Sequence, residues 1–170
     1  EITGLIEGSG TFDAGKVTEP HNSLVNFNGT SAQVIPLGSS VVSTFCDVEI
    51  NNTSTVTTDT AFTSSNLFGY FTVNSGTFTH AYSHEFSDSV ANHATYNVSD
   101  SMDIEGSFTN TGTLTSSGSR INLAGDWNNS GTYTYFAGDT VTLDGSALQS
   151  LTGSTTFSVL ELSNTASASP

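Results

Sequence analysis

Hydrophobic and polar residues alternate along most of this chain, and short runs rich in asparagine, threonine and glycine interrupt the alternation at intervals. The stretches 102–114 and 121–133 carry one pattern twice, with matched residues 19 positions apart. A third copy begins at Val141, 20 positions after Ile121. The alternation predicts strands with one buried face, and the Asn-Ser/Thr-Gly-Thr runs predict tight turns whose glycines adopt positive φ.

This repeat predicts an all-β protein, a parallel β-solenoid with coils of about 19–20 residues. A short strand can bury only one face, so each coil needs a neighbouring coil above and below it. In such a stack Phe108 is expected to lie over Trp127, and Leu114 over Tyr133. The alternative fold is a β-sandwich completed by strand exchange with a neighbouring molecule.

The chain, 1–170, is predicted to be a single solenoid domain or a slice of a longer repeat array. Residues 78–101 depart from the pattern and are interpreted as an irregular insertion, and 165–170 as a linker-like tail. The segments 25–35 and 141–151 resemble each other in sequence. We therefore expect those two segments to occupy equivalent positions in the coil.

Composition disfavours nucleic-acid binding and membrane insertion. The formal net charge is −14, from 16 acidic residues against two basic ones. Nucleic-acid binding is disfavoured because phosphate neutralisation needs many lysines and arginines. No apolar run is long enough to predict insertion into a membrane. The single cysteine, Cys46, lies in an apolar strand candidate and is expected to be buried as a small hydrophobe.

Three segments also carry a family resemblance. They are Phe27-Asn28-Gly29-Thr30-Ser31-Ala32-Gln33, Gly125-Asp126-Trp127-Asn128-Asn129-Ser130-Gly131-Thr132-Tyr133 and Gly153-Ser154-Thr155-Thr156-Phe157-Ser158-Val159-Leu160-Glu161-Leu162. They resemble the β-strand repeats of large secreted bacterial surface proteins, akin to haemagglutinin-like adhesins. The resemblance implies an extracellular or cell-surface location and a structural or adhesive task, and it supplies no catalytic residue.

The end coils of a solenoid expose unpaired sheet edges, and lysine, which often protects such edges, occurs only once in this chain. We therefore predict a non-enzymatic structural subunit that stacks end to end into a filament or forms part of a long surface stalk. Its partners would be copies of itself or further repeats of the same chain. The residues expected to form the assembly edges are Ile2, Leu5, Ile6, Phe12, Phe157, Val159, Leu160 and Leu162.

Two alternatives concern carbohydrate. An adhesin module would bind glycan or a surface through aromatic side chains, for which Trp127, Tyr133 and Tyr135 are the candidates. A carbohydrate-active β-helix enzyme would need two carboxylates in a groove lined by aromatic residues. Asp126 lies beside Trp127, but no second acid is fixed opposite it, so no catalytic residue is predicted.

Two metal sites were considered. His80, His84 and His93 with Asp88 have metal-ligand character. Within one strand, however, His80 and His84 would share a face four residues apart, so rings packed on a solvent-facing strand are preferred. Calcium binding through turn acids stays open as the one cofactor option, although no calcium-loop spacing is present. Those acids are Asp100, Asp103, Glu105, Asp126, Asp139 and Asp144.

Threonines raise one more hypothesis, because flat threonine ladders on solenoids order water and bind ice. Thr53, Thr55 and Thr57, and later Thr132 and Thr134, have suitable local spacing. These threonines are not expected to recur at one position in successive coils. Ice binding is therefore not predicted from the sequence.

Overall fold

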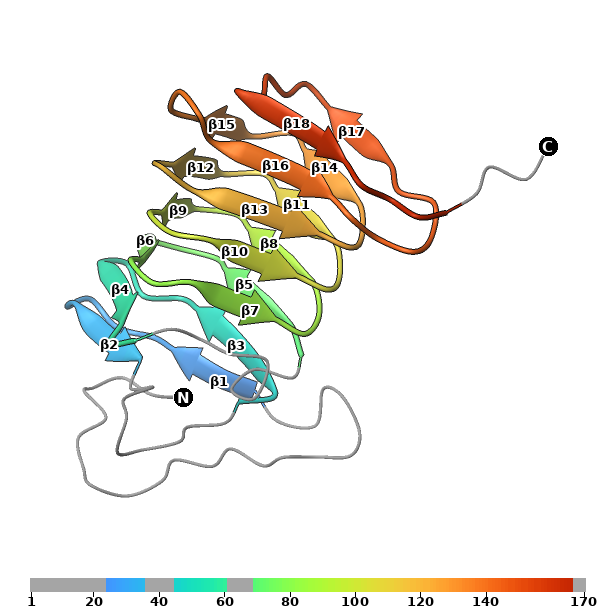
Figure 1. Ribbon diagram of the computed structural model, residues 1–170. Helices are drawn as coiled ribbons and strands as arrows, with labels where there is room; N and C mark the ends of the chain where they lie inside the picture. The colour runs from blue at the N-terminus through green and yellow to red at the C-terminus, as the bar shows by residue number, and fades with distance from the viewer. Residues whose placement is uncertain (1–23, 36–44, 61–68, 167–170) are drawn as a thin grey trace.

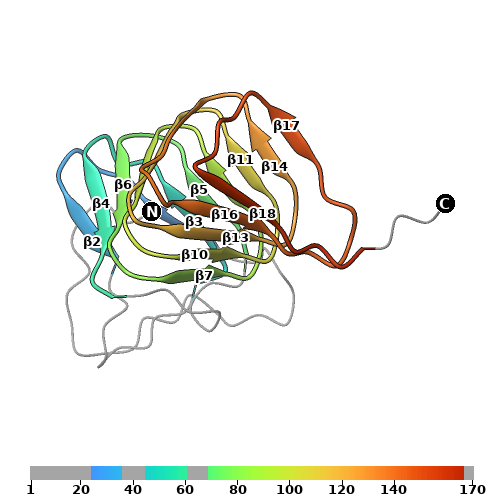
Figure 2. The same ribbon diagram turned by 45° about the horizontal axis from the view of Figure 1, so that its top comes forward.

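The computed structural model of the protein describes residues 24–35, 45–60 and 69–166. These residues form a parallel β-solenoid with three sheets, which make the three sides of the middle coils (Figures 1 and 2). The predicted all-β solenoid is confirmed. Among the described residues there is no helix long and apolar enough to cross a membrane.

The chain visits the sheets in a fixed order, for example β10, β11 and then β12. Sheet A contains β1 (Leu24–Phe27), β3 (Asp47–Ile50), β5 (Phe71–Val73), β8 (Val90–Asn92), β11 (Phe108–Asn110), β14 (Trp127–Asn129) and β17 (Leu151–Gly153). Sheet B contains β7 (His84–Phe86), β10 (Met102–Ile104), β13 (Arg120–Leu123), β16 (Thr140–Leu143) and β18 (Val159–Leu162). Sheet C contains β2 (Gln33–Ile35), β4 (Thr55–Thr58), β6 (Thr77–His80), β9 (Thr95–Val98), β12 (Thr113–Ser116) and β15 (Thr132–Thr134).

The pairing register confirms the predicted ladders, because Phe108 pairs with Trp127 and Leu114 with Tyr133. In sheet B the register advances by 18, 19 and then 20 residues from His84 through successive coils. The first two coils are longer, and sheet A there advances by 23 residues at each step. The predicted coil length therefore holds for the middle of the stack but not for its first coils, nor for the last step of sheet A, from Trp127 to Leu151.

Alternate residues of each strand point into one continuous core. Tyr96, Phe71 and Phe78 form an aromatic cluster there, with ring centroids 4.8 to 6.3 Å apart. Cys46 is buried, as expected. Since strands this short bury only one face, the stacking of coils supplies most of the apolar contact that stabilises each of them.

Buried asparagines stabilise the corner between sheets A and C. The side-chain amide of Asn92 donates to Oδ1 of Asn110, and that of Asn110 donates to Oδ1 of Asn129, both at 2.7 Å. The Asn110 amide also donates to the carbonyl oxygen of Thr132 at 3.1 Å. Each buried amide thus finds partners in its neighbouring coils, as a buried polar group requires.

The glycines of these corners have a different role from the one predicted. Gly76 has positive φ, at 66°. At Gly112 and Gly131, however, the glycine is needed because an added Cβ would collide with the backbone of the preceding coil, at Ala94 and Gly112 respectively. Close stacking of corners therefore explains most of the Asn-x-Gly-Thr pattern.

Two sequence interpretations are wrong. Residues 78–101 form β6 to β9 and continue all three ladders, so they are not an irregular insertion. Segments 25–35 and 141–151 begin in different sheets, since Val25 lies in sheet A and Val141 in sheet B. Their similarity reflects a shared strand-and-turn grammar and not an equivalent place in the coil.

Candidate functional site: the open C-terminal end

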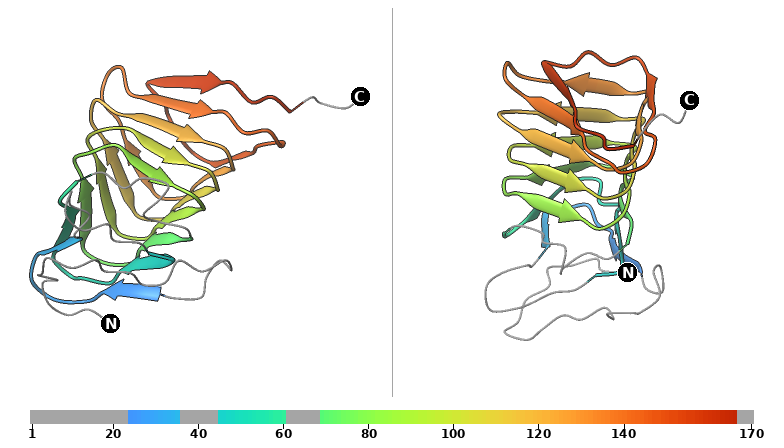
Figure 3. Two further views of the ribbon diagram at one scale, coloured as in Figure 1. Left: turned by 60° about the horizontal axis from the view of Figure 1, so that its bottom comes forward. Right: turned by 45° about the vertical axis from the view of Figure 1, so that its right-hand side comes forward.

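The C-terminal end of the described stack presents three sheet edges together (Figure 3). Strands β15, β17 and β18 are the last strands of sheets C, A and B, and each is paired on one side only among the described residues. The contrast with the preceding coil is sharp in sheet B, where every residue of β16 is buried and every residue of β18 is exposed.

Two apolar ladders continue onto this open strand. Leu160 pairs with Val141, and Leu162 pairs with Leu143. Val141 is 1% exposed and Leu143 4%, whereas Leu160 is 36% and Leu162 72% exposed. Val159, also predicted as an edge residue, is 39% exposed. The inward face of β18 is therefore ready to be covered by another coil.

The other two sides of this end are partly closed. Phe157 is half-buried, with its ring centroid 5.4 Å from Trp127 and 6.0 Å from Tyr133. The Trp127 indole Nε1 donates to Oγ1 of Thr155 at 3.1 Å, and the Asn129 amide donates to the same atom at 2.9 Å. Of the predicted edge residues, Phe157 thus serves as a partial lid over the aromatic core, while Leu160 and Leu162 mark the open side.

The predicted edge residues of the other end, Ile2, Leu5, Ile6 and Phe12, lie outside the described residues. The tail residues 167–170 lie outside them as well. Among the described residues, the candidate assembly edges therefore lie at the C-terminal end.

The two histidines that sequence reasoning placed on one solvent-facing strand lie instead on two strands, inside the solenoid. His80 ends β6 and His84 begins β7, so the chain turns a corner between them. Both are buried, and their ring centroids are 4.4 Å apart. His80 Nδ1 lies 3.0 Å from the Tyr96 hydroxyl, and His84 Nε2 lies 3.3 Å from Oγ1 of Thr58.

Burial keeps this histidine pair neutral. Loss of water contact lowers the pKa of His84 to about 4. Burial also lowers the pKa of His80 well below its usual value, and a charge on neighbouring His84 would lower it further. His80 Nε2 is buried and has no hydrogen-bond partner among the described residues. The pair therefore belongs to the core at neutral pH.

The remaining metal candidates lie at other corners. His93 follows β8 at an exposed turn, where Nδ1 lies 2.8 Å from Oγ1 of Thr111. Asp88 lies between β7 and β8, and its carboxylate accepts a hydrogen bond from the Ser89 amide. The four predicted residues are thus divided among three corners of the coil and do not form one site.

The acids considered for calcium are also dispersed or occupied. Asp139 accepts hydrogen bonds from the Phe136 and Ser119 amides and from the Ser116 hydroxyl. Burial alone would raise its pKa, but these hydrogen bonds outweigh burial and lower it. Within the part of the chain that the structure describes, no three His, Cys, Asp or Glu side chains are arranged to hold a metal ion. This applies to all six candidate calcium ligands, which are Asp100, Asp103, Glu105, Asp126, Asp139 and Asp144.

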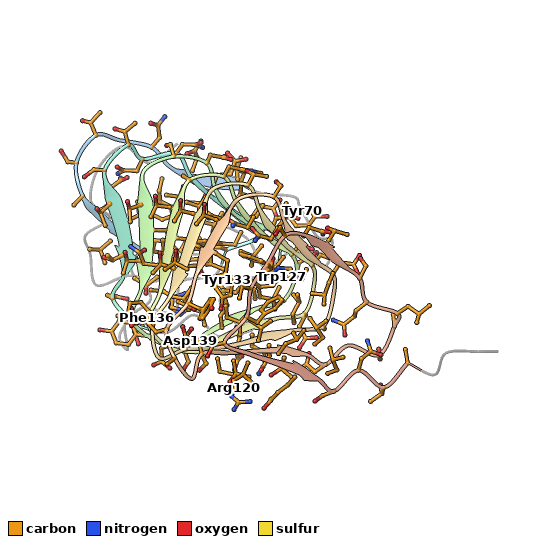
Figure 4. All side chains as sticks on the ribbon, turned by 90° about the horizontal axis from the view of Figure 1, so that it is seen from above. Tyr70, Arg120, Trp127, Tyr133, Phe136 and Asp139 are labelled. Carbon is orange, nitrogen blue, oxygen red and sulfur yellow. The ribbon has the colours of Figure 1, made fainter. Side chains whose placement is uncertain are left out.

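The aromatic residues proposed for glycan contact do not form an exposed platform. Trp127 is 1% exposed and stacks on Phe108 at 5.0 Å, and Tyr133 is half-buried beside it (Figure 4). Only Tyr135, 37% exposed, reaches the surface. Asp126, the acid beside Trp127, accepts a hydrogen bond from the Ser150 amide at 2.7 Å.

A shallow groove lies elsewhere, over the outer face of sheet A near its N-terminal strands. It has a volume of about 330 Å³ and is bordered by the exposed side chains of Tyr70 and Leu24 and by Asp47 and Glu49. The Tyr70 amide donates to the Asp47 carboxylate at 2.8 Å. Sequence reasoning did not find this groove, because its lining comes from strands that are far apart in sequence.

Threonines on the outer face of sheet C form a feature that sequence reasoning considered and set aside. Thr55 pairs with Thr77, Thr77 with Thr95, Thr95 with Thr113, and Thr113 with Thr132. The expectation that threonines do not recur at one position in successive coils is therefore wrong. The signal was present as repeated Thr-x-Thr triplets, but their spacing varies between 18 and 22 residues.

Comparison with known proteins adds no family to this geometry: no family model, no curated protein and no solved structure matches the chain.

Proposed function

We propose that this chain is a non-enzymatic structural segment of an extracellular or cell-surface assembly, which stacks end to end through its open C-terminal coil into a filament or a long stalk. The observation that supports this function is the continuation of two buried ladders onto β18, where Leu160 and Leu162 are exposed. The partner is a further coil, from a second copy or from further repeats of the same chain.

Physical chemistry favours covering this end. Burying an exposed leucine or valine side chain stabilises by about 1.5–3 kcal/mol. The unpaired backbone groups of β15, β17 and β18 are a template for additional strands. These three strands contain no lysine, arginine or proline, which are residues that hinder edge pairing. Glu161 is their single charged residue, and it points outward like Thr142 beneath it.

The test is electron microscopy and sedimentation velocity of the purified chain over a range of concentrations. We expect rods that lengthen with concentration. Leu162→Lys places a charge at an apolar position that the next coil would cover, and it should abolish the rods. The matched control is Asn122→Lys, which adds the same charge on the outer face of β13 in the same sheet, away from the end. Monodisperse particles at every concentration, or rods that persist in Leu162→Lys, would contradict stacking through this end.

A second candidate is an adhesin module that binds glycan, and the groove on sheet A favours it. An exposed tyrosine ring beside two carboxylates suits a sugar, whose apolar face stacks on the ring while its hydroxyls donate to the acids. Tyr70→Ala should abolish binding on a glycan array, with Tyr135→Ala as the control at an exposed tyrosine outside the groove. An array without a hit would remove this candidate.

A further inference from the structure

The outer face of sheet C carries two parallel files of polar side chains, nine threonines and one asparagine. The first contains Thr55, Thr77, Thr95, Thr113 and Thr132, and the second contains Thr57, Thr79, Asn97, Thr115 and Thr134. Each Thr-x-Thr triplet encloses a residue that points into the core, such as Phe78 or Leu114. The face is therefore a two-dimensional lattice, attached to a packed interior.

Backbone geometry sets the spacing of this lattice. Neighbouring strands lie about 4.8 Å apart, and residues two apart along a strand lie about 6.6 Å apart. Threonine suits such a lattice because its branched side chain is restricted at χ1, so its hydroxyl and methyl groups hold fixed positions. The two distances are similar to oxygen–oxygen repeats on the faces of hexagonal ice.

The hydroxyls are also available to an external partner. Among the described residues, the single hydrogen bond that any of these threonine hydroxyls makes within the protein joins Thr79 to the amide of Asn97, at 3.2 Å. The threonines of the central strands are half-exposed, and Thr132 and Thr134 are exposed. Water therefore completes their hydrogen bonding in the isolated chain.

Charge separates this face from the neighbouring one. The outward positions of sheet B include Glu85, Asp103 and Glu161, and Asp103 has a raised pKa owing to burial and to the acids around it. In sheet C none of the outward positions of β4, β6, β9, β12 and β15 is charged. The charged side chains of the described strands lie instead on sheet B and on β3 of sheet A. Charged side chains retain a hydration shell that would disturb an ordered water lattice, so this face suits a neutral, periodic partner.

We propose that the threonine face of sheet C binds ice. A hydrogen bond contributes about 1 kcal/mol net, so one hydroxyl is a weak contact. Fixing a water molecule costs up to about 2 kcal/mol, but in a crystal that cost has already been met. A rigid hydroxyl lattice then gains from many contacts at once, because neither surface has to be ordered first. A flexible or irregular ligand offers no such match.

The experiment measures thermal hysteresis, ice-crystal shaping and partition into growing ice. The protein is the full chain carrying Leu162→Lys, so that association does not change between samples. Thr113→Lys, inside the first file with a threonine on each side, should remove most of the hysteresis. Thr109→Lys adds the same charge on the outer face of sheet A in the same coil and should leave it unchanged. Circular dichroism of both variants verifies the fold.

Two further variants separate hydroxyl from shape. Thr113→Ser keeps the hydroxyl and frees its rotamer, whereas Thr113→Val keeps the shape and removes the hydroxyl; both should reduce the hysteresis by less than Thr113→Lys does. Absence of hysteresis and of ice shaping in the folded parent protein would overturn the proposal. Equal effects of Thr113→Lys and Thr109→Lys would overturn it too. Retention on insoluble crystalline cellulose or chitin without any effect on ice would assign the lattice to a polysaccharide and reject ice.

Discussion

The middle coils and the C-terminal coil are built from the same ladders, but only the middle coils bury them. Ile121 and Val141 lie in the sheet B ladder with a strand on each side, and both are 1% exposed or less. Leu160 continues that ladder with one neighbour and is 36% exposed. In a stack of this kind the contribution of a side chain to stability depends on whether a coil lies on both sides of it.

The largest difference is expected for apolar truncation. Phe108→Ala removes a fully buried ring from a middle coil and should lower the free energy of unfolding by about 4 kcal/mol. Leu162→Ala, on the open strand, should change it by less than about 0.5 kcal/mol. Urea unfolding followed by circular dichroism gives both values. Similar losses at the two positions would mean that the end coil is already covered in solution.

The second-largest effect is expected from acid, which should lower the free energy of unfolding through the buried histidines. The folded state keeps His84 neutral down to about pH 4, whereas the unfolded chain takes up a proton below about pH 6.5. The contribution of His84 to the free energy of unfolding is therefore fully present at pH 7. It is lost as pH falls from about 6.5 to about 4, which lowers the free energy of unfolding by about 3 kcal/mol. His80 adds a loss of the same sign.

Replacing the group tests this prediction. His84→Met extends the apolar ladder of Met102 and should remove the His84 share of the pH dependence between pH 4 and 6.5, leaving that of His80. His93→Gln, at an exposed turn, is the matched control. Urea unfolding at several pH values measures both, and an unchanged slope in His84→Met would show that other groups cause the acid sensitivity.

A smaller difference is expected for asparagine. Asn110→Ala removes the middle amide of a buried chain, so Asn129 Oδ1 loses its donor and the Asn92 amide loses one of its two acceptors, at a cost of about 2 kcal/mol. Asn164 makes similar bonds to Gln149 and Ala147 near the open end. Because water replaces lost bonds there, Asn164→Ala should cost less than about 1 kcal/mol. Thermal unfolding of the pair ranks them, and the reverse order would refute the comparison.

The sequence predicted best where coil length is constant. The 19-residue step from 102 to 121 aligned strands and corners together, so the ladder of Phe108 and Trp127 was predictable. The step failed where alternation runs through a corner: Phe78, His80, Tyr82, His84 and Phe86 alternate like one strand, but β6 ends at His80 and β7 begins at His84. Alternation alone does not show where one strand ends at a corner and the next begins.

The site residues were predicted unevenly for similar reasons. Val159, Leu160 and Leu162 follow from the apolar pattern and an uncovered end, which need no tertiary detail. Trp127 was predicted both to lie in the ladder of Phe108 and to be a candidate glycan contact, because an aromatic residue beside a turn looks alike whether it faces the core or the solvent. The threonine files were missed because corner lengths vary from coil to coil, and only pairing in three dimensions shows that Thr55 and Thr132 belong to one file.

Hydrogen exchange followed by mass spectrometry tests the central claim most directly, by comparing β18 with β13 in one sample over a range of concentrations. Stacking through the open end predicts that the amides of β13 are protected throughout. The β18 amides that face the open edge should exchange rapidly at low concentration and become protected as rods form. Equal protection of β18 and β13 at the lowest concentration, or rapid exchange of β18 within assembled rods, would contradict it.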